Sequence, residues 1–102
     1  MKVAVIGATG LVGQKMLQVL AEQNLQIDEI VVAASDKSIG RKVTYKDQEL
    51  TLISMDQAVE ARPNIAIFSA GAEVSLQYAE KFAAVGTYVI EEEDADILKQ
   101  FL

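Results

Sequence analysis

The chain alternates short apolar runs with stretches of helical periodicity. Apolar runs of four or five residues are typical of strands buried on both faces of a parallel sheet. The stretches between them carry apolar residues three or four positions apart, which indicates amphipathic helices. Strands are predicted over residues 2–6, 30–34, 65–68 and 87–90, and helices over residues 11–24, 56–61 and 75–85. This order predicts an α/β fold, a Rossmann-like, doubly wound, mostly parallel sheet with helices on both faces.

Between the second strand and the second helix the pattern is that of a hairpin. Residues 42–45 and 49–53 are short strand-like runs, and Lys46-Asp47-Gln48 is the predicted turn. Either Ser54 or Asp56 fits the N-cap of the next helix, which Pro63 ends. Gly86 is the predicted C-terminal stop of the helix over 75–85.

Composition narrows the class of protein. The 102 residues suffice for one domain, and no apolar run approaches the roughly 20 residues of a membrane-spanning helix. We therefore expect no membrane partner and a cytoplasmic location. Cysteine and histidine are both absent, so we expect no metal site and find no catalytic constellation. Eight basic and ten acidic side chains in residues 1–90 form no basic stripe, so we expect no nucleic-acid partner.

Three glycines spaced three apart follow the first predicted strand and open the first predicted helix. Gly7 allows a sharp turn off the strand, Gly10 allows close approach of a ligand, and Gly13 allows the helix to pack closely on the strand. The helix N-terminus that follows offers N–H groups and a partial positive charge to an anion. The pattern predicts a site for a dinucleotide pyrophosphate.

The loop after the second predicted strand bears on the choice of cofactor. Asp36 alone would favour NAD, because a carboxylate at this place binds the ribose 2′-hydroxyl. Ser35, Lys37, Ser38 and Arg41 together offer two hydroxyls and two cations to a 2′-phosphate, which favours NADP. We therefore predict NADP as the cofactor.

Small residues follow the third parallel strand. Ser69, Ala70 and Gly71 face the same crevice at the carboxyl edge of the sheet and let a cofactor pass close to the backbone.

Tyr78 and Lys81 lie three residues apart, whereas the tyrosine and lysine of short-chain reductases lie four apart on a helix. We interpret this pair as a packed tyrosine beside a surface lysine.

Three of these segments carry a family resemblance. Residues 2–13, 34–41 and 65–71, in this order, closely resemble the N-terminal NADP-binding domain of aspartate-semialdehyde dehydrogenases. The resemblance covers about residues 1–90. Related semialdehyde and acyl-phosphate reductases share the glycine loop but match the other two segments less well.

The resemblance implies a reaction and a set of binding residues. The family performs the reversible, NADP-dependent reductive dephosphorylation of aspartyl phosphate, on the route to lysine, threonine and methionine. By position, the glycine loop would hold the pyrophosphate, the loop over 35–41 the 2′-phosphate, and residues 69–71 the ribose and nicotinamide side. The candidate cofactor-binding residues are Gly7, Thr9, Gly10, Leu11, Val12, Gly13, Ser35, Lys37, Ser38, Arg41, Ser69, Ala70 and Gly71.

The chain departs from the family pattern after Ile90. Residues 1–102 are predicted to form the dinucleotide-binding domain, with residues 91–102 as an acidic tail in which 94–102 could form a helix. Family members continue into an Asp-Asn-Ser/Thr-Ser type segment and a substrate domain with a cysteine nucleophile and a histidine, which are absent here. We expect no catalysis by this chain alone. The alternative is a structural, engineered or regulatory Rossmann module with little cofactor affinity, and exposed apolar surface could support a homodimer.

Overall fold

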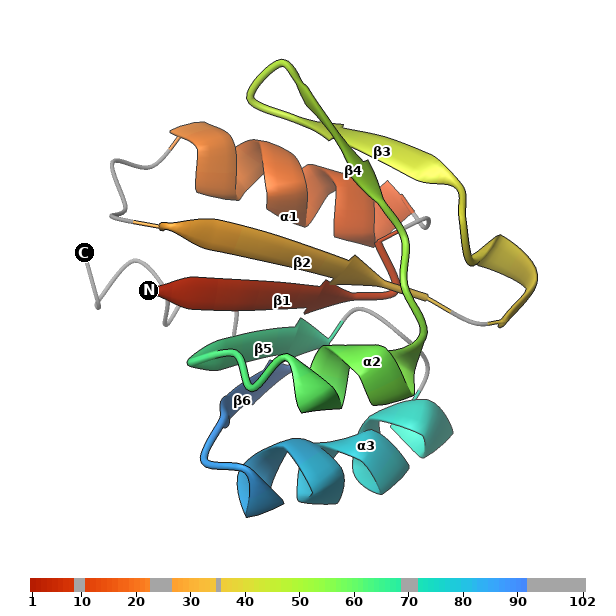
Figure 1. Ribbon diagram of the computed structural model, residues 1–102, viewed down its shortest axis with the longest axis vertical. Helices are drawn as coiled ribbons and strands as arrows, with labels where there is room; N and C mark the ends of the chain where they lie inside the picture. The colour runs from red at the N-terminus through yellow and green to blue at the C-terminus, as the bar shows by residue number, and fades with distance from the viewer. Residues whose placement is uncertain (9–10, 23–26, 35, 69–71, 92–102) are drawn as a thin grey trace.

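The computed structural model describes residues 1–8, 11–22, 27–34, 36–68 and 72–91 (Figure 1). The strands of the main sheet are β1 (Lys2–Ile6), β2 (Glu29–Ala33), β5 (Ile65–Phe68) and β6 (Tyr88–Glu91). A separate hairpin consists of β3 (Lys42–Tyr45) and β4 (Gln48–Thr51), and a short 3₁₀ helix covers Asp36–Ser38. The helices are α1 (Leu11–Glu22), α2 (Met55–Glu60) and α3 (Ala72–Ala84).

The main sheet is parallel and has the strand order β2-β1-β5-β6. The chain leaves β1 for one neighbour, β2, and later returns to the opposite side of β1 to form β5. The direction of winding thus reverses at β1, as in a doubly wound fold. The predicted fold class is therefore confirmed, and the carboxyl ends of β1 and β5 flank the place where ligands bind in such sheets.

Alternate residues of the strands are buried on opposite faces of the sheet. In β1, all four residues from Val3 to Ile6 are fully buried. Val3 and Val5 belong to the core under α1 and the hairpin, whereas Ala4 and Ile6 belong to the core under α2 and α3. This two-sided burial explains why β1 is a continuous apolar run rather than an alternating one.

Each face has its own covering layer. On one face, α1 buries Met16 and Leu17, which lie four and three positions before the buried Leu20. On the other face, the rings of Phe68 in β5 and Phe82 in α3 meet edge to face, with centroids 5.6 Å apart. This geometry is favourable for an aromatic pair.

The short helix α2 is delimited by local sequence signals. The Ser54 hydroxyl accepts the Gln57 backbone N–H, and the Gln57 side chain accepts the Ser54 N–H, which completes a capping box. Of the two predicted N-caps, Ser54 is the one used. The helix was predicted over 56–61 and covers Met55–Glu60, with Ala61 as its C-cap; it ends before Pro63 as predicted. Gly86, at φ +87°, follows α3 as the predicted glycine stop.

Several predicted boundaries were wrong. The strand β2 begins at Glu29 and ends at Ala33, because it pairs with β1 from Lys2 onward. The predicted strand over 49–53 ends at Thr51, because Ile53 leaves the hairpin and bridges to Ala33 of β2. The predicted strand over 87–90 lies one residue later, at Tyr88–Glu91.

Two local conformations also differ from the prediction. The hairpin turn has two central residues rather than three, Lys46 and Asp47, with φ of +46° and +64°. These values are typical of a type I′ turn, which matches the twist of the paired strands. The helix α3 starts at Ala72, three residues before the predicted Ser75. The predicted helix over 94–102 lies outside the described residues.

Candidate functional site

The first component of the site is the turn that leaves β1. Gly7 has a φ of +82°, a left-handed conformation that glycine adopts without a steric penalty. Its N–H donates to the Ala33 carbonyl at 2.8 Å, and the Ala8 N–H donates to the same oxygen at 3.3 Å. The turn off β1 is thereby tied to the carboxyl end of β2.

The second component is the contact between this turn and α1. A Cβ atom added to Gly13 would lie 2.3 Å from the Gly7 carbonyl oxygen and 2.7 Å from the Ala8 Cα. Both atoms belong to the backbone, so no side-chain movement could relieve the clash. Glycine at position 13 therefore permits the close packing of helix on strand that the sequence predicts.

Two helices begin at this edge of the sheet. The 12-residue α1 begins at Leu11, shortly after β1, and the 13-residue α3 begins at Ala72, shortly after β5. Their first backbone N–H groups lack partners within the helix, and each helix dipole is positive at this end. The carboxyl edge between β1 and β5 therefore favours an anionic ligand.

The third component is the loop over residues 36–41. The Arg41 N–H donates to the Ser38 carbonyl at 3.1 Å. Leu52 accepts the Gly40 N–H at 2.9 Å and donates its own N–H to the Arg41 carbonyl at 2.8 Å. Because the next residue, Ile53, donates to Val32 at 3.0 Å, these bonds fasten the loop to the end of β2.

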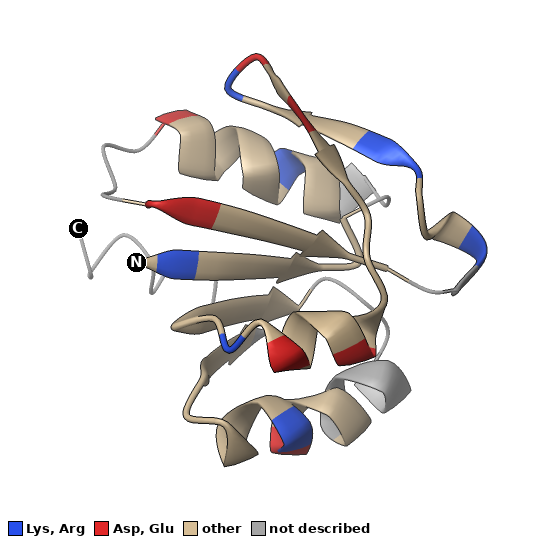
Figure 2. Cartoon of the chain, in the orientation of Figure 1, with Lys and Arg blue, Asp and Glu red and all other residues tan. Residues whose placement is uncertain are grey.

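The side chains of this loop are available to a ligand. Lys37 and Arg41 are exposed, and Ser38 is half-buried. The loop thus presents two cations and one hydroxyl, and hydrogen bonds connect both the loop, through Leu52 and Ile53, and the turn at Gly7 to the end of β2. Figure 2 shows a basic position on the segment that follows β2. Sequence reasoning missed the anchoring through Leu52 and Ile53, because it depends on pairing between distant segments.

The structure describes only part of the predicted site. Gly7 and Gly13 are brought into contact, and Lys37, Ser38 and Arg41 share one anchored loop. Leu11 and Val12 are described by their backbone alone, as the first residues of α1. The other predicted residues lie outside the described ones: Thr9, Gly10, Ser35, Ser69, Ala70 and Gly71.

The geometry around Tyr78 and Lys81 agrees with a structural interpretation. The Lys81 ammonium lies 4.7 Å from the centroid of the Tyr78 ring and 3.6 Å from an Asp56 carboxylate oxygen. The contact with Asp56 joins α3 to α2.

Within the described part of the chain, no group of three or more acidic side chains could hold a metal ion, and no helix is long and apolar enough to cross a membrane.

The parallel doubly wound sheet, the glycine turn and the two helix N-termini define a Rossmann-type nucleotide-binding domain. Comparison with known families agrees, since residues 2–95 match the model of the semialdehyde dehydrogenase NAD-binding domain. The chain belongs to this family. Its cofactor class is accordingly that of the nicotinamide dinucleotides.

Individual relatives are aspartate-semialdehyde dehydrogenases. The chain is 41% identical over 91 residues to the enzyme of Legionella pneumophila, covering 89% of this chain and 26% of the relative. It is 43% identical over 93 residues to the enzyme of Bacillus subtilis, covering 91% of this chain and 27% of the relative. The chain thus spans about a quarter of the length of these enzymes.

Solved structures show the same relationship. Aspartate-semialdehyde dehydrogenase II of Vibrio cholerae, complexed with ASA, superposes with a TM-score of 0.83 at 36% identity. The match covers 88% of this chain and 30% of that one. The Candida albicans enzyme with NADP superposes with a TM-score of 0.74 at 20% identity over 88% of this chain and 28% of that one, which indicates a shared fold.

Proposed function

We propose that this chain is the NADP-binding domain of an aspartate-semialdehyde dehydrogenase and does not catalyse the family reaction alone. The observation that carries the proposal is the contact of Gly13 with the Gly7 turn, at the carboxyl edge of a sheet that matches this family over residues 2–95. A dinucleotide phosphate needs such a close approach of helix and turn. Residues 1–102 are proposed as the cofactor domain, and residues 91–102 as its acidic tail.

The choice of NADP over NAD rests on the loop over 36–41. A 2′-phosphate carries about two negative charges and accepts hydrogen bonds from cations and hydroxyls. Lys37, Ser38 and Arg41 supply these groups from one anchored loop, and Ser35 is proposed to join them. When bound, the cofactor would supply hydride transfer, while the residues of this chain bind and orient its adenosine half. Asp36 is the residue on which an NAD-binding alternative depends.

The whole enzyme's chemistry is also part of the proposal. The relatives named above are aspartate-semialdehyde dehydrogenases, and we propose reductive dephosphorylation of aspartyl phosphate as the reaction to which this domain contributes. The acyl-enzyme chemistry of that reaction requires a nucleophilic thiolate, and the 102 residues contain no cysteine. Residues 69–71 are proposed for the ribose and nicotinamide side.

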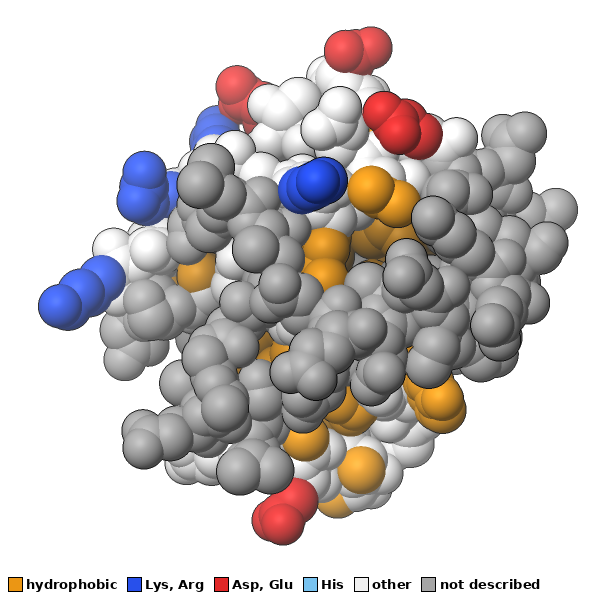
Figure 3. Space-filling view, turned by 180° about the vertical axis from the view of Figure 1, so that it is seen from behind, with side chains coloured by type: hydrophobic (Ala, Val, Ile, Leu, Met, Phe, Trp, Pro, Cys, Tyr) orange, Lys and Arg blue, Asp and Glu red, His pale blue; other side chains and the backbone are white. Residues whose placement is uncertain are grey.

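A homodimer is the second partner proposed besides the cofactor. Ile39 and Tyr88 are the large hydrophobic side chains that are well exposed among the described residues, at 44% and 53%. Seen from behind, hydrophobic side chains are exposed in separate places on this face, and the Lys and Arg side chains lie in its upper part (Figure 3). Self-association through such a surface would be concentration-dependent, which analytical ultracentrifugation measures directly.

Calorimetric titration with NADPH, and with NADH in parallel, tests the cofactor assignment. We expect saturable NADPH binding, and Arg41→Gln should weaken it roughly ten- to hundredfold, because a hydrogen bond to a charged group contributes about 1.5–3 kcal/mol. NADH affinity should change by less than about threefold, since NADH has no 2′-phosphate.

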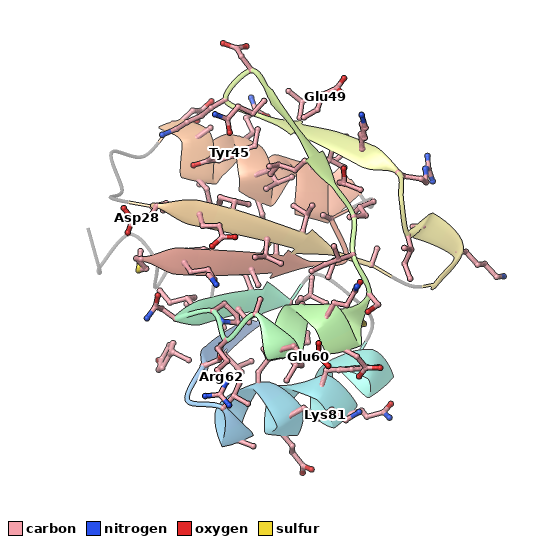
Figure 4. All side chains as sticks on the ribbon, viewed as in Figure 1. Asp28, Tyr45, Glu49, Glu60, Arg62 and Lys81 are labelled. Atoms are coloured by element: carbon pink, nitrogen blue, oxygen red, sulfur yellow. The ribbon has the colours of Figure 1, made fainter. Side chains whose placement is uncertain are left out.

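Arg62→Gln is the matched control for that titration. It removes the same charge from an exposed arginine after α2, remote from the loop over 36–41 (Figure 4). We expect unchanged NADPH affinity. Absence of binding at millimolar NADPH would leave the alternative, a Rossmann module with little cofactor affinity. Equal losses for NADPH and NADH in Arg41→Gln would instead contradict the assignment of the 2′-phosphate site.

A further inference from the structure

A hollow on the surface lies between α1 and the first strand of the hairpin. Its volume is about 670 Å³, within the range of small-molecule sites. Gln14, Lys15 and Gln18 of α1 form one wall, and residues 42–44 of β3 form the other. The strand β3 lies alongside α1 in the fold (Figure 1). We call this hollow the α1–β3 groove.

The lining of the α1–β3 groove combines polar and apolar surface, and each wall carries one lysine. Lys15 and Lys42 are exposed and come from opposite walls, and both walls also contribute amide or hydroxyl groups. Val43 is the apolar member and is half-buried. Basic segments are visible on both α1 and the start of β3 in Figure 2.

Nearby carboxylates neutralise only part of this charge. Lys42 lies 3.5 Å from the Glu49 carboxylate across the hairpin, and both side chains are more than half exposed. Glu22 accepts a hydrogen bond of 3.5 Å from the Gln18 amide. Within the described chain, no carboxylate lies within ion-pair distance of the Lys15 ammonium. A ligand with two negative charges can compete for Lys42, because an exposed ion pair stabilises by only about 0.2–1 kcal/mol.

We propose that the α1–β3 groove is a binding site for a small phosphorylated molecule, distinct from the cofactor site. A lysine ammonium binds phosphoryl oxygens as a point charge, and two lysines on opposite walls suit a group that carries two negative charges. The amide and hydroxyl groups of its walls bind the remaining oxygens. A hollow of about 410 Å³ elsewhere includes Asp28 and Glu29 in its lining and is less suited to an anion.

The groove and the cofactor site use different residues. The proposed cofactor cations, Lys37 and Arg41, belong to the loop over 36–41, and neither lines the groove. Lys15 and Lys42 follow the glycine turn and that loop in sequence but belong to regular elements. Filling the cofactor site should therefore leave the groove open, so the two sites can be tested separately.

The experiment is an amide NMR titration of the ¹⁵N-labelled chain with inorganic pyrophosphate at matched ionic strength. It is performed with and without saturating NADPH. We expect saturable shifts at residues 14, 15, 18 and 42–44 in both series. In the variant Lys15→Gln/Lys42→Gln the fitted Kd should rise roughly five- to tenfold, as expected for removing two exposed charge contacts.

A charge-matched variant separates a site from general attraction of anions. Lys46→Gln/Lys81→Gln removes two positive charges from the hairpin turn and from α3, and its Kd should stay within about twofold of the parent. The proposal is overturned by equal weakening in both variants, by the absence of saturable shifts, or by shifts confined to residues 37, 38 and 41 that NADPH abolishes. If NADPH fails to bind, the titration of the free chain still decides about the groove.

Discussion

Backbone hydrogen bonds fasten both edges of the parallel sheet, but the amino edge adds bonds made by side chains. At the amino edge, side chains bond to each other and to the backbone. The Thr87 hydroxyl donates to the Pro63 carbonyl at 2.7 Å, and the Lys2 N–H donates to the Asn64 side chain at 2.8 Å. Lys2 also donates through its ammonium to the Ala61 carbonyl at 2.8 Å, and the N-terminal ammonium pairs with Asp28.

At the carboxyl edge, bonds between main-chain groups anchor the turn at Gly7 and the loop over 36–41. Gly7 bonds to Ala33, and Gly40 and Arg41 bond to Leu52. Lys37 and Arg41 of the loop over 36–41 are exposed, and the helices α1 and α3 begin at this edge. Where hydrogen bonds of the backbone hold the loops at the edge of a sheet, the side chains of those loops are available to bind a ligand. We therefore expect variants at the amino edge to lose stability alone, and variants at the carboxyl edge to lose binding.

Gly13→Ala should have the largest effect, because it changes the backbone contact that shapes the carboxyl edge. The new Cβ would lie 2.3 Å from the Gly7 oxygen. Overpacking of this kind costs up to about 3 kcal/mol, which outweighs the gain of about 1 kcal/mol from alanine in a helix. We expect a net loss of about 2 kcal/mol in urea unfolding and a loss of NADPH binding under native conditions.

Gly86→Ala is the comparison for that variant. Gly86 has a left-handed φ of +87°, and an added Cβ there would meet no atom within 4 Å. Its replacement should cost about 1 kcal/mol through backbone strain and leave NADPH affinity unchanged. Full stability and full binding in Gly13→Ala would show that close packing of α1 on the turn is not required.

Thr87→Val tests the amino edge and should have the next largest effect. The variant keeps the shape of the side chain but leaves the Pro63 carbonyl without its buried donor. The expected loss is about 1–2 kcal/mol in the free energy of unfolding, with NADPH affinity within twofold of the parent. Thr51→Val, at an exposed position of β4, should change stability by less than about 0.5 kcal/mol. A binding defect in Thr87→Val without a stability defect would contradict the division between the edges.

Features that depend on neighbours in sequence could be predicted. The central strands β1 and β5 are apolar runs because they are buried on both faces, and this signal is local. The role of Gly13 followed from its spacing to Gly7, and the structure confirms the close packing. Gly86 was identified as a helix stop, and Ser54 was one of two candidate N-caps, because caps depend on one or two residues.

Features that depend on distant pairing could not be predicted. The end of β4 was wrong because Ile53 bonds to β2, some 20 residues earlier, and no local signal marks that change of partner. The start of α3 was wrong because Ser75, a good N-cap type, lies inside the helix. The turn at Lys46 and Asp47 adopts positive φ without a glycine, so the usual type I′ signal was missing.

Lys2→Met should lower the free energy of unfolding less than Gly13→Ala or Thr87→Val does. It tests the side-chain contacts at the amino edge. Lys2 joins three elements, since its ammonium bonds to the Ala61 carbonyl after α2 and lies 3.4 Å from Glu29 of β2. Methionine keeps most of the apolar stem, so the loss isolates the charged contacts. We expect about 0.5–1 kcal/mol in urea unfolding, and a smaller difference in 1 M salt because the Glu29 pair is screened.

A double-mutant cycle with Glu29→Gln separates the two contacts of Lys2. The coupling free energy between the two substitutions measures the Lys2–Glu29 ion pair. The part of the stability loss in Lys2→Met that remains in 1 M salt measures the bond to the Ala61 carbonyl. That bond places a cation at the C-terminal end of α2, where the helix dipole favours positive charge. Lys15→Met, on an exposed position of α1, is the control and should change stability by less than about 0.5 kcal/mol. If Lys2→Met weakened NADPH binding more than it weakened folding, the amino edge would have a role in the site, because its contacts would then be coupled to the ligand across the length of β1.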